Sequence, residues 1–184
     1  TLNLGTVTRC LFTTLQITPG KTIFVEGSAT GTGLDALKSS IRTGLFSTGL
    51  VSSEDRAEFV RSQGAVGAIN RKDPAIADCF TAIPDDPQEA IAWEKQGEAL
   101  VEQYRAINKG KLADFVVSHA GERAFPRSFQ LLEEGGRLAF YGASSGYHFS
   151  FMGKSGTATP EDMLQRAELR GGESVLLYYG PRSR

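Results

Sequence analysis

The chain has 184 residues, a length that suits one compact domain and is short for two. Its 20 basic and 21 acidic residues leave a formal net charge of −1, so it lacks the overall positive field that nucleic acids and anionic membranes attract. No apolar stretch reaches the ~20 residues that cross a bilayer, and Cys10 and Cys79 lie far apart in sequence. We therefore expect a cytoplasmic domain with reduced thiols, no nucleic-acid partner and no membrane partner.

The first part of the chain alternates between helical and strand patterns. Leu34, Leu37 and Ile41 recur at spacings of three and four, which is typical of one face of a helix. In chain order the pattern predicts the end of a helix over residues 5–16, a strand over 21–27, a helix over 31–45, a strand over 46–52, a helix over 53–64 closed by Gly64, and a strand over 67–70.

The second part begins with an irregular insertion over residues 71–86 and continues the alternation. Pro87 is well placed in the first turn of a long surface helix. The predicted elements are a helix over 87–108, a strand over 113–121, a helix broken around Pro126 over 123–134, a strand over 136–144, a Gly- and Ser-rich loop to about Thr159, a helix over 159–168, and a sixth strand over 173–180.

Strands that alternate with helices are typical of βαβ units. The sequence therefore predicts an α/β fold with a doubly wound parallel sheet of about six strands, as in the Rossmann fold. Residues 1–184 make up this one domain. Because the chain begins at Thr1 and ends directly after an apolar run, we expect it to be a piece of a longer polypeptide.

The turn after the first strand, "EGSATGTG", is a candidate phosphate site. Gly27, Gly31 and Gly33 lack the Cβ atoms that keep a backbone away from a pyrophosphate, and the helix amides from about Thr32 onward point at the same place. Ser28 and Thr30 offer hydroxyl donors. The spacing departs from G-x-G-x-x-G, so a tight corner between packed elements explains the turn equally well.

The end of the second strand favours NADP over NAD. A carboxylate at this position binds the ribose hydroxyls of NAD, whereas this chain has Ser52 and Ser53, followed by Arg56. Hydroxyls and a guanidinium donate to a phosphate dianion. Arg71 ends the neighbouring third strand and is expected close by. The alternative is that both arginines are ordinary solvated surface residues.

Two later loops are expected to face the nicotinamide half of a dinucleotide. His119 ends the fourth strand, and Gly142, Ala143 and Ser144 end the fifth. A single histidine at a strand end is more often structural than a general base. The sequence contains no Cys and His spacing that fits zinc, so we expect no metal.

Four stretches together resemble a known family: "TPGKTIFVEGSATGTGLDALK", "LVSSEDRAEFVRSQGAVGAINR", "DDPQEAIAWEKQGEALVEQYR" and "DFVVSHAGERAFPRSFQLLEEGGRLAFYGASSGY". They are similar to the cofactor domain of enoyl-CoA reductases in the medium-chain dehydrogenase/reductase superfamily. The branch is that of the crotonyl-CoA carboxylase/reductases, and within it the acrylyl-CoA reductase portions of propionyl-CoA synthases. The resemblance covers about residues 8–180.

This resemblance implies that the parent enzyme transfers hydride from NADPH to the β-carbon of a short 2-enoyl-CoA, such as acrylyl-CoA. A GroES-like substrate domain, which binds most of the enoyl-CoA, is expected outside this chain, as is the proton donor. Carried over to this sequence, Gly27, Gly31, Gly33 and Thr32 bind the pyrophosphate, Ser52, Ser53, Arg56 and Arg71 face the 2′-phosphate, and His119 with Gly142 to Ser144 lines the nicotinamide ribose. A homo-oligomer through the sixth strand is the further partner expected.

One departure from the family bears on the reaction. In the carboxylating branch a histidine near the last strand helps to hold carbon dioxide, and the matching stretch here, "GESVLLYYG", has Val175 at the nearest position. We therefore expect reduction without carboxylation.

Other classes fit less well. No tyrosine has a lysine four residues later, as a short-chain dehydrogenase needs, and a methyltransferase needs a carboxylate where Ser52 and Ser53 stand. "GKS" at 153–155 resembles the end of a phosphate loop, but His148 occupies the place of its first glycine. A non-catalytic module that senses NADP remains the alternative to a reductase.

Overall fold

The computed structural model describes residues 2–84, 86–121, 123–142, 145, 168–169 and 175–179. Within these residues the chain forms one sheet in the order β3-β2-β1-β4-β5-β7-β6. The strands are β1 (Thr22–Val25), β2 (Phe46–Val51), β3 (Gly67–Asn70), β4 (Ala113–Ser118), β5 (Leu132–Tyr141), β6 (Glu168–Leu169) and β7 (Val175–Tyr179). The first five run parallel, which confirms the predicted Rossmann fold.

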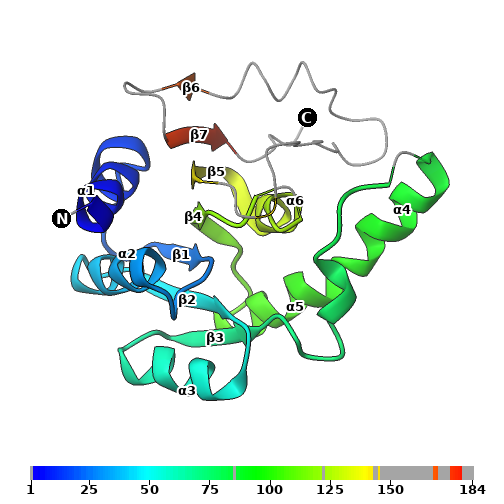
Figure 1. Ribbon diagram of the computed structural model, residues 1–184, viewed down its shortest axis with the longest axis horizontal. Helices are drawn as coiled ribbons and strands as arrows, with labels where there is room; N and C mark the ends of the chain where they lie inside the picture. Colours follow the sequence, from blue (N-terminus) through cyan, green and yellow to red (C-terminus); the bar gives the residue numbers. More distant parts are fainter. Residues whose placement is uncertain are drawn as a thin grey trace.

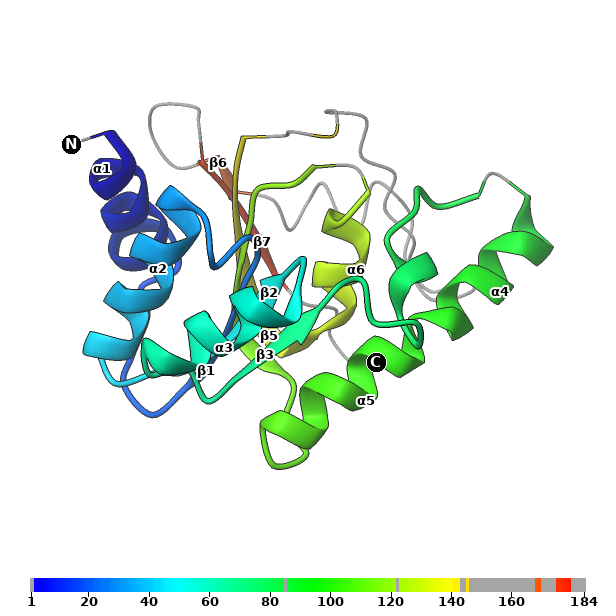
Figure 2. The ribbon, with the colours of Figure 1, turned by 60° about the horizontal axis from the view of Figure 1, so that its bottom comes forward.

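Helices cover both faces of the sheet (Figures 1 and 2). On one side lie α1 (Leu2–Thr8), the π-helix η1 (Arg9–Thr14), α2 (Gly31–Arg42) and α3 (Glu54–Ser62). On the other lie α5 (Glu98–Ile107) and α6 (Phe125–Gln130), with the 3₁₀ helix η2 (Ala77–Cys79) and α4 (Pro87–Gln96) before them in the chain.

The strands separate two hydrophobic layers because successive side chains point to opposite faces. In β1, Ile23 and Val25 pack in the layer with α2, whereas Phe24 packs in the layer with α5 and α6. In β4, Val117 packs in the layer with α2, and Val116 packs in the layer with α5 and α6. Strands that are buried on both faces explain why the sequence shows continuous apolar runs instead of alternation.

The sixth predicted strand exists as β7, but it runs antiparallel to β5, with Arg137 paired to Tyr179 and Tyr141 to Val175. The expectation of a parallel sixth strand was wrong. An apolar run does not encode the direction of a strand, and mixed sheets often carry an antiparallel strand near the edge. The two-residue β6 pairs with β7 on its outer side, and Glu168, predicted in a helix, belongs to it.

The predicted helix over 87–108 is two helices, α4 and α5, which meet at Gly97. A Cβ atom at Gly97 would overlap the side chains of Arg127 and Gln130, so the helix pair needs glycine where it passes α6. The helix predicted over 31–45 ends at Arg42, because Gly44 has a φ of +88°. Gly64, with a φ of +99°, follows the end of α3 as expected.

None of the helices in the described ranges combines the length and the apolar character that crossing a membrane requires.

Candidate functional site

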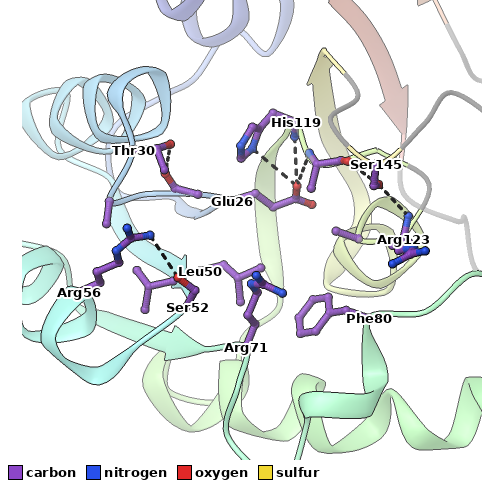
Figure 3. Close-up of a pocket in the computed structure, with 15 residues that line it drawn as sticks. Glu26, Thr30, Leu50, Ser52, Arg56, Arg71, Phe80, His119, Arg123 and Ser145 are labelled. Atoms are coloured by element: carbon purple, nitrogen blue, oxygen red, sulfur yellow. Dashed lines mark hydrogen bonds and ion pairs between the residues drawn. The ribbon is translucent and has the colours of Figure 1, made fainter.

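A pocket of about 420 Å³ lies where the parallel strands β1 to β4 end. Figure 3 shows Arg56 and Arg71 on one side of it and His119 with Ser145 on the other. The lining residues are Glu26, Gly27, Ala29, Thr30, Leu50, Val51, Ser52, Arg56, Arg71, Phe80, His119, Ala120, Arg123, Ala124 and Ser145. Both the volume and the position at the carboxyl ends of the strands suit a small-molecule site of an α/β fold.

The turn after β1 is a tight corner. Gly27 has a φ of +58°, and a Cβ atom there would overlap the His119 imidazole. A Cβ atom at Gly33 would overlap the carbonyl group of Gly27, so this glycine lets α2 approach the turn. A Cβ atom at Gly31 would lie 3.1 Å from Asn3 Nδ2. The three glycines therefore allow close packing, whether or not a phosphate lies nearby.

The beginning of α2 nevertheless has the features of an anion site. Thr30 is the N-cap residue, but its hydroxyl donates to the carbonyl oxygen of Gly27 at 2.6 Å and forms no capping bond. The first amides of the 12-residue helix, from Gly31 to Gly33, consequently have no side-chain cap and carry the positive end of the helix dipole. Thr32 is the second residue of this helix and is half-buried.

Two of the predicted serines do not line the pocket. Ser28 is fully buried, and its hydroxyl donates to the carbonyl oxygen of Leu50 at 3.3 Å, so it ties the turn to β2. Ser53 is the N-cap residue of α3. Their proximity to the glycines and to Ser52 in the sequence suggested a phosphate contact, but the Ser28 hydroxyl bonds to β2, and Ser53 makes no side-chain capping bond and does not line the pocket.

Ser52, Arg56 and Arg71 do come together. Arg56 Nη1 donates to Ser52 Oγ at 3.2 Å, and Arg71 N donates to the carbonyl oxygen of Val51 at 2.9 Å. The parallel pairing of β2 with β3 brings Arg71 to the edge where Arg56 lies. Two guanidinium groups therefore border the pocket beside the end of β2, where the residue type determines whether a Rossmann fold prefers NADP or NAD.

Glu26 directly follows β1 and organises the opposite side, although the sequence reasoning did not single it out. Its carboxylate is 1% exposed and accepts hydrogen bonds from Ser118 Oγ at 2.9 Å and from the N–H groups of His119 and Ala120 at 3.1 Å each. Ser128 Oγ in α6 donates to the same carboxylate. An acid between an apolar run and a glycine was visible in the sequence, but its partners lie 92 to 102 residues away.

His119 lines the pocket beside this carboxylate. Its Nδ1 atom is 3.9 Å from Glu26 Oε2 and finds no hydrogen-bond partner among the described residues. The imidazole stacks on Tyr141, with centroids 5.7 Å apart and planes at 21°. Burial raises the pKa of Tyr141 above its ordinary value.

Phe80 and Arg123 also line the pocket and were not predicted. Phe80 comes from the irregular stretch before α4, where the sequence has no periodicity that would reveal its position. Arg123 N donates to Ser145 Oγ at 3.4 Å, and the Ser145 hydroxyl bonds to the carbonyl oxygen of Ala120 at 2.5 Å.

The remaining predicted residues lie at the end of β5. Gly142 is exposed, has a φ of +66° and does not line the pocket. Ala143 and Ser144 lie outside the described residues. In the part of the chain that the structure describes, no group of three His, Cys, Asp or Glu side chains could hold a metal ion.

The site can therefore bind an extended anion. Three arginines line the pocket, and the carboxylate among them already has four hydrogen-bond donors. Gly31, Thr32 and Gly33 do not line the pocket, but they follow Thr30, which does, so the uncapped start of α2 can take one phosphate group at its edge. Arg56 and Arg71 can take another.

Comparisons of the sequence and of the structure with known proteins find similarity to the same kind of protein. No protein-family model matches the chain. Over 158 residues, or 82% of the chain, it is 32% identical to a crotonyl-CoA carboxylase/reductase of Cereibacter sphaeroides, and the match spans 35% of that protein. Among solved structures, a crotonyl-CoA carboxylase/reductase superposes with a TM-score of 0.75 and 30% identity, covering 82% of this chain and 36% of that one.

A second solved structure, the crotonyl-CoA carboxylase/reductase AntE in complex with NADP, has a TM-score of 0.75 and 25% identity, and the match covers 82% of this chain and 38% of AntE. The chain thus spans little more than a third of the length of these relatives. Over the residues matched, the chain is crotonyl-CoA carboxylase/reductase-like in sequence and has the Rossmann fold of these relatives.

Proposed function

We propose that the chain is the NADPH-binding domain of an enoyl-CoA reductase. The observation that carries the proposal is the pocket at the strand ends, which is lined by Arg56, Arg71 and Thr30, the N-cap residue of the uncapped α2. These groups suit a pyrophosphate and a 2′-phosphate, and the NADP bound to the related AntE supports the assignment. NADPH supplies a hydride; the residues of this chain bind and orient it.

The proposed substrate is a short 2-enoyl-CoA such as acrylyl-CoA, which accepts the hydride at its β-carbon and a proton at its α-carbon. It is bound mainly by a domain outside this chain, which also supplies the proton donor. We infer reduction without carboxylation, because Val175 stands where the carboxylating branch has a histidine.

The proposal includes partners. The remaining domains of a longer polypeptide would complete the active site. A second copy of the chain would add to the sheet beyond β7, where, among the residues described, the two-residue β6 pairs with Leu176 and Leu177.

Calorimetric titration with NADPH and NADH tests cofactor binding. We expect NADPH to bind more tightly than NADH. Arg56→Ala or Arg71→Ala should weaken the binding of NADPH about 10- to 100-fold, because each removes charge-assisted hydrogen bonds, and should leave the binding of NADH unchanged. Arg61→Ala is the matched control, since Arg61 lies on the same helix as Arg56 and pairs with Glu54 at 2.8 Å. An equal loss of affinity for both cofactors in Arg56→Ala, or no binding of either by folded protein, would contradict binding of the 2′-phosphate by Arg56 and Arg71.

Turnover is measured on the longest polypeptide that contains the chain. Oxidation of NADPH with acrylyl-CoA and crotonyl-CoA, with and without bicarbonate, should give reduced products of unchanged carbon number. A carboxylated product in substantial yield would overturn reduction alone. Binding of NADPH without turnover of any enoyl-CoA would favour the regulatory module instead.

A further inference from the structure

The stretch between β3 and α4 forms one wall of the pocket, through Phe80. It has little regular structure beyond η2, and its turns are closed by local bonds such as Ala75 N to Asp73 Oδ1 at 2.9 Å. Phe80 nevertheless lies at a defined place, in contact with the same cavity as Arg71 and Arg123 (Figure 3). Something outside this stretch must hold it.

Arg127 of α6 provides that hold. Its side chain is fully buried, and its Nε and Nη2 atoms donate to the carbonyl oxygens of Cys79 at 2.6 Å and Trp93 at 2.7 Å. The guanidinium also lies 3.4 Å from the centre of the Trp93 ring, and Nη1 donates to Gln130 at 2.9 Å. Hydrogen bonds and the aromatic face compensate for the burial of this charge. The buried cation thus joins α6, α4 and the stretch before it.

These contacts fix the backbone on both sides of Phe80. Cys79, directly before it, accepts from Arg127 and donates its thiol to the carbonyl oxygen of Gln96 at 3.2 Å. Thr81, directly after it, accepts from the Trp93 indole N–H at 3.3 Å. Both neighbours of Phe80 are therefore tied to the same cluster, and the ring between them is held in the pocket wall.

The surroundings of Phe80 indicate its ligand. It contributes the only phenyl ring among the lining residues described, and Leu50, Val51 and Ala124 supply buried apolar surface in the same cavity. Figure 3 shows Arg71 between Arg56 and Phe80. If the two arginines hold the 2′-phosphate, the base attached to that ribose extends toward the apolar side. A flat heteroaromatic ring stacks well on a phenyl ring.

We propose that Phe80 is the stacking contact for the adenine base of the dinucleotide, and that Arg127 is the residue that positions Phe80 for this contact. The inference rests on the proposed function. It assigns a binding role to a stretch whose sequence has no nucleotide motif, and a positioning role to an arginine that does not line the pocket.

The first test compares substitutions of Phe80 by calorimetry, with NADPH and with adenosine 2′,5′-bisphosphate, which has the adenine and the 2′-phosphate but no nicotinamide. Phe80→Ala and Phe80→Leu should weaken both ligands about 10- to 100-fold and by the same factor, whereas Phe80→Tyr should bind as the unchanged protein does. Phe59→Ala is the matched control, because Phe59 is 42% exposed on α3 and does not line the pocket. Full affinity in Phe80→Leu would overturn stacking.

The second test asks whether Arg127 acts through Phe80. Trp93 is the only tryptophan of the chain, so its emission reports directly on the contact with Arg127. In Arg127→Lys we expect a changed emission, unchanged far-UV circular dichroism, and an affinity for NADPH close to that of Phe80→Ala. The double variant, Phe80→Ala with Arg127→Lys, should bind NADPH with the same affinity as each single variant. Additive losses would show that Arg127 affects binding by another route.

The controls separate the two levels of the proposal. If the unchanged protein does not prefer NADPH over NADH, the proposed function fails. If it does and Phe80→Leu has no effect, only the adenine contact fails. Should Arg127→Lys not fold, the Phe80 series still decides whether the ring binds the base.

Discussion

At the scale of single residues, Glu26 shows how one side chain organises the site. Its carboxylate accepts from two serine hydroxyls and two backbone amides, and these donors belong to the end of β4 and to α6. A buried charge is tolerated when it is hydrogen bonded in this way. The loop that carries His119 to the pocket is therefore fixed by an acid that directly follows the neighbouring strand β1.

Substitution of Glu26 should lower the free energy of unfolding, and the loss should increase with the number of hydrogen-bond donors left without an acceptor. We expect Glu26→Ala to lower the free energy of unfolding by about 3–5 kcal/mol. Glu26→Gln should cost only about 1–2 kcal/mol, because its amide oxygen can face the two N–H groups while its NH₂ group donates to the serines. Urea unfolding at pH 7 measures both, and equal losses would contradict the hydrogen-bonding role.

At the scale of elements, the central pair β1 and β4 is joined by an acid at its amino end. The Asp114 carboxylate accepts from Thr22 N at 2.9 Å and from Lys21 Nζ at 2.9 Å. Partial burial opposes ionisation of Asp114, but these hydrogen bonds outweigh it, so the pKa of Asp114 lies below its ordinary value of 3.8. The charged form thus stabilises the folded chain.

Because the folded pKa of Asp114 is depressed, its contribution is complete above the unfolded pKa and is lost as the pH falls through the folded one. We expect Asp114→Asn to be less stable than the unchanged protein by about 1 kcal/mol at pH 7, with the difference shrinking below about pH 4. Urea unfolding between pH 7 and 2.5 tests this, with the exposed Asp55→Asn as control. A constant difference down to pH 2.5 would show that charge plays no part.

At the scale of the whole molecule, the two layers share one sheet, but Trp93 packs in a small separate cluster with Ile83 and Ala90. Arg127 connects this cluster to α6. We expect the Trp93 emission and far-UV circular dichroism to change at the same urea concentration, as in a two-state transition. An earlier change in emission would mean that α4 unfolds separately from the sheet.

The sequence allowed prediction of those features that depend on local pattern. The five parallel strands, the glycine after the end of α3 and the meeting of Ser52, Arg56 and Arg71 follow from apolar runs, turn residues and the order of strands. The break at Gly97, the direction of β7 and the roles of Glu26 and Phe80 depend on partners far away in the chain. Spacing within a short window carries no information about such partners.

The hold of Arg127 on Cys79 has a consequence for how the protein is made. The two residues are 48 positions apart, and Glu26 meets Ser128 across 102 positions. During synthesis the glycine turn, Arg56 and Arg71 leave the ribosome long before α6 does. A nascent chain that stops before Phe125 would have the groups proposed to bind the phosphates, but not the arginine that holds Phe80 in the pocket wall. On the proposed function, the domain is expected to retain its cofactor only when α6 has emerged and docked.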